Sequence, residues 1–598
     1  MATTSEELQQ QFPDLKWKKL PSPEEHPNYT WHGFEPNSKV LLEKGHTRWA
    51  GRLPFPVDTI LERDVAVPMR DGIKIYADIF RPVNTDANEK VPAVIAFSPY
   101  GKTGTGVPSY DIMGPHRIGL KLEDTSGYEK FEGPDPATWA EYGYAIINVD
   151  ARGAGKSEGN VIFYGPQEAE DVYDTIDYIS KQPWCSGSVG MAGNSWLAIS
   201  QINFASRHEH PALKALAPWE GRHDVYRDTL GRGGRRHNPG LHRFLLSGFA
   251  GANSVENMPE MFSERPFFDD YWESKYIHTE NINVPIYLLG SFSSQLHTRG
   301  SFHTFRTAKT SQKWLRVHRY QEWYDLYRPE ANADLKKFYD RFLKGIQNGW
   351  EEDTPPVRLS LLGFEADGSL TKSIEERPEK EWPLDRQQLK ALYLDSASKE
   401  LVWDKPATEG SISHLAEGLT DSSDFIVRFK QHTEIAGYAK VKLWMSCKEH
   451  DDLDVAVQIR KISTDGRPLE HLNYPCPLPV SEVRNDNIAK CLGPQGFLRA
   501  SHRVTKDDKL STAQEVVYKH DRREPISLGE VVDLEITLWP MGMVFAPGEG
   551  IMLRVAGYDM CYPDTDRIKP AYDNNENVGH HTIHTGGRYD SQLILPFV

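Results

Sequence analysis

Five short apolar runs constrain the fold of this 598-residue chain more than any other feature of its sequence. The runs are 91–101, 144–150, 188–193, 213–221 and 284–292. Continuous apolar runs of this kind are typical of strands that are buried on both faces of a sheet. A segment with apolar residues at helical spacing, 166–184, lies between the second and third runs. Strands that alternate with helices form a parallel sheet covered by helices, so we predict an α/β domain.

Ser195 lies just after the third run, before a segment that continues like a helix. Small residues such as Gly193 let the backbone fold back sharply between a strand and a helix, and the helix N-terminus favours developing negative charge. The second glycine of the G-x-S-x-G pattern is missing, because Leu197 stands in its place. The order of strand, turn and helix still predicts a catalytic nucleophile at Ser195, on the sheet edge where active sites collect.

The rest of the chain is organised around this sheet. The segment 60–82 alternates as two strands around Asp71 and Gly72, which indicates a hairpin. Residues 222–283 interrupt the rhythm with aromatic, glycine and charged residues, and we expect a helical cap there. From about 386 onward, apolar and polar residues alternate between turn residues, a pattern typical of a sandwich or jelly roll.

A chain of this length is too long for one hydrophobic core, so several units are expected. We expect an N-terminal arm at 1–59 and an α/β domain formed by 60–221 and 284–385. The cap at 222–283 is inserted into this domain, and a C-terminal all-β jelly-roll domain occupies 386–598.

Charge and composition exclude several classes of partner. The formal net charge is −16, so a broad phosphate-binding face, and with it a nucleic-acid partner, is not expected. The basic cluster 231–236 is interpreted as a solvated loop. No apolar run is long enough for a membrane span, and the first residues do not resemble a secretory signal. The 5 cysteines show no C-x-x-C spacing, so we predict a cytoplasmic protein.

Two segments rich in histidine, 297–305 and 577–587, raise the question of a metal site. Neither contains H-E-x-x-H or a comparable pairing of histidine with carboxylate at helical spacing. We interpret them as loop histidines and predict neither a metal nor another cofactor.

The order of elements resembles the family of serine hydrolases that includes cocaine esterase and X-prolyl dipeptidyl peptidase. The segments that carry the resemblance are VPMRDGIKIYADIFRP, SPYGK, NVDARGAGKSEG, GMAGNSWLA, LRASHR, VDLEITLWP and VAGYDM. The resemblance covers nearly all of the chain from about residue 60 to the end. It implies an α/β-hydrolase domain with an inserted helical cap, followed by a jelly-roll domain.

The resemblance also implies roles for three residues around the turn. Ser195 matches the family nucleophile. The backbone N–H of Trp196 and the hydroxyl of Tyr100, in the segment SPYGK, match the two donors of the oxyanion hole. Such donors stabilise charge that appears only in the tetrahedral intermediate.

The other two members of the catalytic triad do not match cleanly. In the family the acid follows the strand matched by 284–292, but here 291–294 reads Ser-Phe-Ser-Ser and offers no carboxylate. The family base follows the next strand, matched by the segment KWLRVHRYQEWYDLY. One register places His318 in the role of the base, and the other places Glu322 there.

Several assignments of the base and the acid of the triad stay open. His318 is the favoured base, and Glu322 is one candidate for its acid. Glu220, in the segment APWEG after an apolar run, is the best-placed acid on an earlier strand, with Asp224 behind it. His297 is the alternative base because it follows the strand that lacks the usual aspartate. A site without a histidine base would require Glu322 with a pKa raised by burial.

Three functional hypotheses follow. The favoured one is a serine-dependent acyl hydrolase that acts on an ester, amide or thioester of a small organic molecule through an acyl-enzyme at Ser195. The second is a non-hydrolytic metabolite-tailoring enzyme on the same scaffold, for acyl transfer, C–C cleavage or cyclisation. The third is a catalytically silent binding or scaffold protein. The expected partner is a small-molecule substrate, without nucleic acid or membrane, and homo-oligomerisation stays open.

Overall fold

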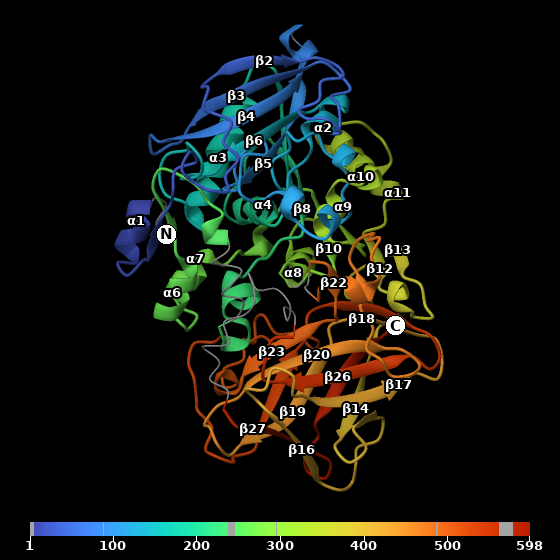
Figure 1. Ribbon diagram of the computed structural model, residues 1–598. Coiled ribbons are helices and arrows are strands. Elements are labelled where there is room, and N and C mark those ends of the chain that lie inside the picture. The colour runs from blue at the N-terminus through green and yellow to red at the C-terminus, as the bar shows by residue number, and fades with distance from the viewer. Residues whose placement is uncertain (1–4, 88, 237–244, 295, 486–487, 561–577) are drawn as a thin grey trace.

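The computed structural model describes residues 5–87, 89–236, 245–294, 296–485, 488–560 and 578–598 (Figure 1). A part with mixed helices and strands lies at one end of the molecule, and a part built from strands lies at the other (Figure 1). The strand order and the helices confirm the predicted fold class, an α/β domain followed by an all-β domain.

Within the described residues, the α/β part is built on one sheet of 11 strands in the order β13-β12-β11-β10-β8-β7-β5-β6-β4-β3-β2. The strands are β2 (Ser38–Leu42), β3 (Thr59–Pro68), β4 (Lys74–Pro82), β5 (Val91–Ser98), β6 (Ala145–Asp150), β7 (Cys185–Asn194), β8 (Leu213–Trp219), β10 (Ile286–Ser291), β11 (Lys313–His318), β12 (Val357–Leu361) and β13 (Ile374–Glu379). The pairs from β12 through β6 are parallel, so their carboxyl ends meet along one edge of the sheet.

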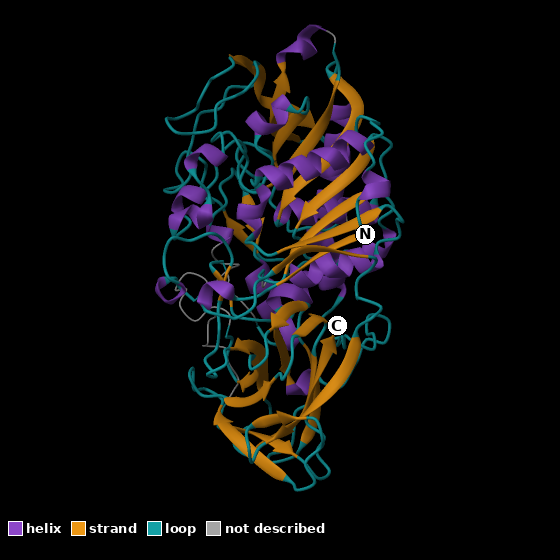
Figure 2. Cartoon of the chain, turned by 90° about the vertical axis from the view of Figure 1, so that its right-hand side faces the viewer, coloured by secondary structure: helices purple, strands orange, loops and turns teal. Residues whose placement is uncertain are grey.

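Helices cover the two faces of this sheet (Figure 2). They are α2 (Pro136–Glu141), α3 (Pro166–Ser180), α4 (Trp196–Arg207), α8 (Thr298–Thr307), α9 (Glu322–Leu326), α10 (Pro329–Phe342) and α11 (Trp350–Asp353). The central strands β5 and β6 are buried along their whole length, as their continuous apolar runs predict.

The N-terminal arm also adds strands to the molecule. β2 pairs with β3 and extends the large sheet at its edge. β1 (Trp17–Lys19) pairs with β9 (Ser254–Glu256), which belongs to the segment inserted after β8. Helix α1 (Ser5–Gln11) precedes β1. The inserted segment also contains a π-helical turn at Tyr226–Leu230, α6 (Met258–Glu264) and α7 (Asp270–Lys275).

The C-terminal part is a β-structure of 13 described strands plus one small pair. The strands are β14 (Gln388–Asp395), β15 (Glu400–Val402), β16 (Gly410–Leu415), β17 (Ser423–Arg428), β18 (Thr433–Gly437), β19 (Lys440–Cys447), β20 (Asp454–Ile462), β23 (Gln495–Arg499), β24 (Val532–Thr537), β25 (Met541–Phe545), β26 (Gly550–Ala556), β27 (His580–Thr585) and β28 (Gln592–Phe597), and the small pair is β21 (His471–Leu472) with β22 (Lys490–Cys491). In β19 and β24 buried residues alternate with more exposed ones, which agrees with the predicted pattern.

The basic cluster 231–236 is not a solvated loop, so that expectation was wrong. Its Arg232 is buried, and the guanidinium lies 3.9 Å from the ring centre of Trp539 in the C-terminal part. A Cβ atom at Gly233 would lie 2.3 Å from the backbone oxygen of Phe497. The cluster therefore packs between the inserted segment and the C-terminal part, where an aromatic face accepts the cation.

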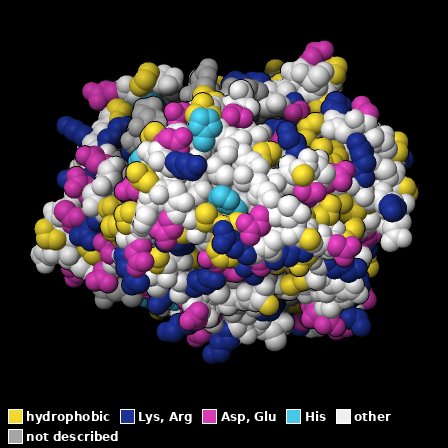
Figure 3. All heavy atoms as spheres, turned by 90° about the horizontal axis from the view of Figure 1, so that it is seen from below, with side chains coloured by type: hydrophobic (Ala, Val, Ile, Leu, Met, Phe, Trp, Pro, Cys, Tyr) yellow, Lys and Arg dark blue, Asp and Glu magenta, His cyan; other side chains and the backbone are white. Residues whose placement is uncertain are grey.

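Charges of both signs are interspersed on the face that the C-terminal part presents when the molecule is seen from below (Figure 3). Among the described residues, we find no helix with the length and apolar character that crossing a membrane requires.

At Gly542 the C-terminal part packs closely against the α/β part. A Cβ atom at this position would lie 2.3 Å from Cε2 of Phe292, the residue that follows β10. Gly542→Val should therefore overpack the boundary and lower the free energy of unfolding by about 1–3 kcal/mol, with Gly542→Ala between valine and the wild type. Urea unfolding of the two variants measures this series, and a valine variant as stable as the wild type would contradict the packing.

Candidate active site

Ser195 occupies the strained turn between β7 and α4. Its backbone has φ 55° and ψ −115°, a conformation that costs a non-glycine residue about 1–3 kcal/mol. The Ser195 N–H donates to the carbonyl of Glu220 at 3.0 Å, which ties the turn to the end of β8. At Gly193, where φ is 129°, a Cβ atom would lie 2.7 Å from the backbone oxygen of Glu132, so glycine is required there. The side chain of Ser195 is half-buried, unlike its fully buried neighbours.

Tyr100 and Trp196 lie on either side of this turn. Tyr100 follows β5 and is buried, and its ring lies 6.0 Å from the ring of Trp196. Burial raises the pKa of Tyr100 well above its ordinary value, so the phenol keeps its proton. Trp196 is the first residue of α4, and its indole Nε1–H donates to Glu168 at 2.6 Å. The backbone N–H of Trp196 therefore belongs to the open first turn of a helix.

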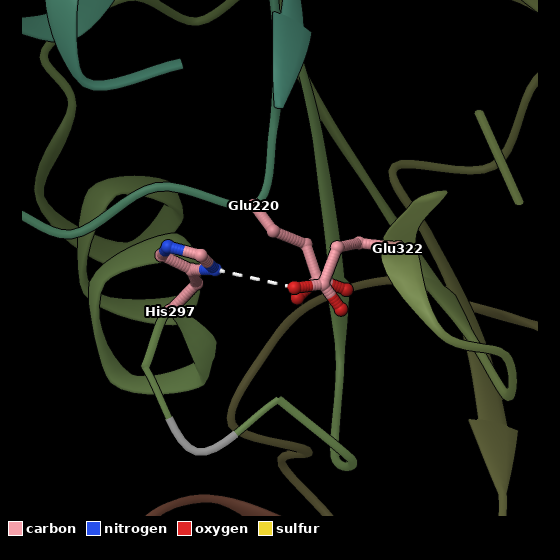
Figure 4. Close-up of side chains that lie close together, drawn as sticks. All are labelled: Glu220, His297 and Glu322. Carbon is pink, nitrogen blue, oxygen red and sulfur yellow. Dashed lines mark ion pairs between the residues drawn. The ribbon is translucent and has the colours of Figure 1, made fainter. Parts of the chain in front are cut away.

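Glu220, His297 and Glu322 come together from three consecutive strand ends (Figure 4). Glu220 follows β8 with φ 55°, His297 precedes α8 and Glu322 begins α9. His297 Nδ1 lies 3.7 Å from Glu322 Oε1 and 3.3 Å from the hydroxyl of Ser294. All three side chains are buried, which strengthens the electrostatic interactions among them.

His318, at the end of β11, contacts Glu220. Its Nε2 lies 3.0 Å from Glu220 Oε1 and 3.8 Å from Asp325 Oδ2. Burial disfavours the charged imidazole, but Asp325 and Glu220 together raise the pKa of His318 above its ordinary value. Asp325 is itself held by Arg316, with Nη2 at 2.5 Å from Oδ2. Glu220 is thus linked through His318 to a buried chain of opposite charges.

Opposing effects act on the pKa of the Glu220 carboxyl group. Burial and the neighbouring Glu322 raise its pKa, while His318 and His297 act in the other direction. The net direction is upward, because a fully buried carboxylate loses its hydration and lies next to a second carboxylate.

Five predicted side chains, Ser195, Glu220, His297, His318 and Glu322, lie on one edge of the sheet. In the usual order for this fold an acid follows the nucleophile along the chain, and a histidine comes last. Here a glutamate follows β8, a histidine follows β10 and a second glutamate follows β11, so the histidine of the cluster has one candidate acid before it and one after it along the chain.

The same cluster has the composition of a metal-binding site. One ligand atom from each of Glu220, His297 and Glu322 lies within 4.8 Å of the other two. Two carboxylate oxygens and an imidazole nitrogen suit a divalent cation such as Zn²⁺ or Mn²⁺. The prediction that the protein needs no metal stays a prediction.

Two further buried residues border the cluster, and the sequence analysis missed both. Glu132 accepts hydrogen bonds on Oε1 from Trp323 Nε1 at 2.7 Å and from Asn194 Nδ2 at 3.0 Å. Burial raises the pKa of Glu132 to about 8, with a smaller contribution from Glu322. Arg222 lies two residues after Glu220. Neither belongs to a motif, and only the position of Arg222 after the segment APWEG could have drawn attention to it.

Comparison with known proteins identifies the family. The model of the X-Pro dipeptidyl-peptidase (S15) family matches residues 71–257, and the model of the X-Pro dipeptidyl-peptidase C-terminal non-catalytic domain matches 348–594. The crystal structure of a CocE/NonD family hydrolase from Staphylococcus aureus is 32% identical, with a TM-score of 0.80. It aligns with 90% of this chain and 94% of its own chain. The chain belongs to the CocE/NonD hydrolase family.

Other relatives agree with this assignment. Cocaine esterase from a Rhodococcus species is 24% identical over 90% of this chain and 98% of its own. An α-amino acid ester hydrolase shares the fold, with 18% identity, a TM-score of 0.64 and coverage of 90% and 97% of the two chains. This CocE/NonD protein is therefore a serine hydrolase, a class that cleaves ester and amide bonds. The assignment favours the first of the three functional hypotheses over the silent scaffold.

The raised pKa of Glu132 predicts a pH-dependent stability. The folded chain keeps a proton on Glu132 that the unfolded chain releases between about pH 4.5 and pH 8. The wild type should therefore lose stability relative to Glu132→Gln as the pH rises through this window, by about 2–4 kcal/mol in total.

Thermal unfolding at a series of pH values measures this difference. Glu141→Gln, which changes an exposed glutamate at the end of α2, is the matched control and should follow the wild type. A constant difference between Glu132→Gln and the wild type would show that Glu132 titrates normally.

Proposed function

We propose that this hydrolase cleaves a small organic ester, amide or thioester through an acyl-enzyme at Ser195, with His297 as the base and Glu322 as its acid. The observation that carries the proposal is the strained turn at Ser195, which leaves this residue half-buried between β7 and α4. Such a turn presents a serine to substrate at the edge of the sheet and places it at the start of a helix.

The contacts of its imidazole support His297 as the base. Its Nδ1 faces Glu322 and Ser294, which leaves Nε2 to take the proton of a nucleophile. This is the division of roles in a serine–histidine–carboxylate triad, in which the carboxylate orients the imidazole and stabilises the imidazolium. His318 instead directs Nε2 at Glu220, so its imidazole is already engaged by a carboxylate.

His318 acts in this scheme as a positioning residue. Its contact with Glu220 compensates the charge of that carboxylate, which lies beside Glu322. Two adjacent buried carboxylates repel one another, and a cation on one of them reduces the cost of ionising both. Glu322 then stays available to His297.

The reaction follows from these positions. The Ser195 oxygen attacks the acyl carbon while its proton moves to His297, and the oxyanion is stabilised by the Tyr100 hydroxyl and the Trp196 N–H. The bond to the leaving group breaks, and the leaving group takes the proton from His297. Water then attacks the acyl-enzyme by the same sequence, which releases the acid and restores Ser195.

Relatives support the substrate class in outline. One is named a cocaine esterase, and another is named an α-amino acid ester hydrolase. Acyl transfer, C–C cleavage and cyclisation on the same scaffold predict products other than the acid and alcohol or amine of simple hydrolysis. The cytoplasmic location, the absence of nucleic-acid and membrane partners, and homo-oligomerisation stay predictions.

Labelling with a fluorophosphonate probe tests the nucleophile and the base together. Ser195→Ala should abolish labelling. His297→Gln should slow it by roughly 10²-fold or more, because the serine loses its proton acceptor. His318→Gln is the matched control and should slow labelling less, because it disturbs only the charge balance at Glu220. Loss of labelling in His318→Gln with normal labelling in His297→Gln would assign the base to His318.

Tyr100→Phe tests the oxyanion hole. Phenylalanine keeps the ring, which lies 6.0 Å from the ring of Trp196, and removes only the hydroxyl. Loss of one donor of this kind lowers kcat by roughly 10²- to 10³-fold. Steady-state kinetics on a 4-nitrophenyl ester should show this fall with little change in KM. An unchanged kcat would remove Tyr100 from the mechanism.

A further inference from the structure

Arg222 places a buried positive charge next to the proposed catalytic residues. It lies two residues after Glu220, and its side chain is 3% exposed. Nη1 donates to the hydroxyl of Thr229 at 2.7 Å, and Nη2 donates to the hydroxyl of Tyr164 at 2.8 Å. Both partners are neutral, and the ring of Tyr164 lies 5.6 Å from the guanidinium carbon, so these contacts hold the guanidinium in place without an opposite formal charge.

The guanidinium has no carboxylate partner in the part of the chain that the structure describes. None of the ion pairs within 4.0 Å among the described residues involves Arg222. Its Nε is buried and has no hydrogen-bond acceptor there. A buried arginine is almost always paired, because removing a charge from water is costly without an opposite charge.

The surroundings of Arg222 connect it to the nucleophile. The hydroxyl of Tyr164 accepts the hydrogen bond from Arg222. The ring of Tyr164 lies 4.9 Å from the ring of Trp196, the residue that follows Ser195. Tyr100 and Glu132 both lie within electrostatic range of the guanidinium. Arg222 is therefore joined through Tyr164 to the residue that follows the nucleophile.

Glu132 does not neutralise Arg222. Its Oε1 accepts from Trp323 and Asn194, its Oε2 has no hydrogen-bond partner among the described residues, and no ion pair within 4.0 Å joins Glu132 to Arg222 there. Burial raises the pKa of Glu132 to about 8, so at neutral pH this group is mainly an uncharged acid. An anion from outside the chain would supply the missing negative charge.

We infer that Arg222 binds a carboxylate of the substrate, so that the enzyme prefers esters with a free carboxylate close to the scissile bond. The inference rests on the proposed function, because it assigns the substrate class of the Ser195 site. A guanidinium has five N–H donors, and the two bonds to Thr229 and Tyr164 leave the Nε–H and one hydrogen on each Nη. Two of these can bind the two oxygens of a carboxylate in parallel.

Close packing of Gly300 against the backbone of Arg222 keeps this residue in position. A Cβ atom at Gly300, in the first turn of α8, would lie 2.4 Å from the Cα of Arg222. The helix that follows His297 therefore packs directly on the segment that carries Arg222. The proposed base and the proposed carboxylate site are held by the same contact.

Paired substrates measure the preference. Mono-(4-nitrophenyl) glutarate and 4-nitrophenyl pentanoate differ in a carboxylate on the acyl side, and 4-acetoxybenzoate and 4-acetoxybenzamide differ on the leaving-group side. The ratio of kcat/KM within at least one pair should favour the anion, and Arg222→Gln should lower that ratio roughly tenfold to a hundredfold. Arg222→Lys keeps the positive charge without the parallel N–H donors of the guanidinium, and it should give an intermediate ratio.

Arg207→Gln is the matched control. This arginine, at the end of α4, donates to the backbone carbonyls of Ser274 and Tyr276, and its loss should leave the ratio unchanged. Equal kcat/KM within both pairs, or a preference that survives in Arg222→Gln, would overturn the inference. If Arg222→Gln does not fold, a ratio in Arg222→Lys equal to that of the wild type would overturn it.

A binding measurement separates this inference from the proposed function. Calorimetric titration of glutarate and 4-hydroxybenzoate into Ser195→Ala should show binding of at least one, and the double variant with Arg222→Gln should bind it at least tenfold more weakly. Binding that depends on Arg222 without any Ser195-dependent turnover would refute the catalytic proposal alone. Turnover of neutral esters without such binding would refute only the carboxylate site.

Discussion

The contact between His318 and Glu220 is the interaction on which the rest of the site depends. It brings the imidazole of His318 to 3.0 Å from a buried glutamate, and His318 in turn lies near Asp325 and its partner Arg316. Without this chain of alternating charges, two carboxylates at one strand edge would repel each other or take up protons.

The backbone of Glu220 matters as much as its charge. Its carbonyl accepts the N–H of Ser195, so one residue braces the nucleophile turn with its main chain and borders the proposed base with its side chain. Arg222, two residues further along the chain, adds a buried positive charge. The loop after β8 thus joins the nucleophile, the carboxylates and the proposed substrate anion site.

Much of the fold could be predicted from local pattern, and the failures have physical reasons. The buried strands β5 and β6 show their continuous apolar runs because both faces are covered by protein. β2 was missed because it is a mostly exposed edge strand without a buried pattern. The cluster 231–236 was misinterpreted because charge suggests solvent, whereas Arg232 packs on Trp539.

The sequence by itself determined the sheet, the all-β second half and the position of Ser195, because strand periodicity and a tight turn are local properties. It also supplied every member of the acid and base cluster as a candidate. Only the tertiary structure decided that His318 faces Glu220 while His297 faces Glu322, and that Arg222 has no carboxylate partner among the described residues. Those contacts join side chains from strand ends that are far apart in the chain. Spacing along the sequence does not give the distance between such residues in space.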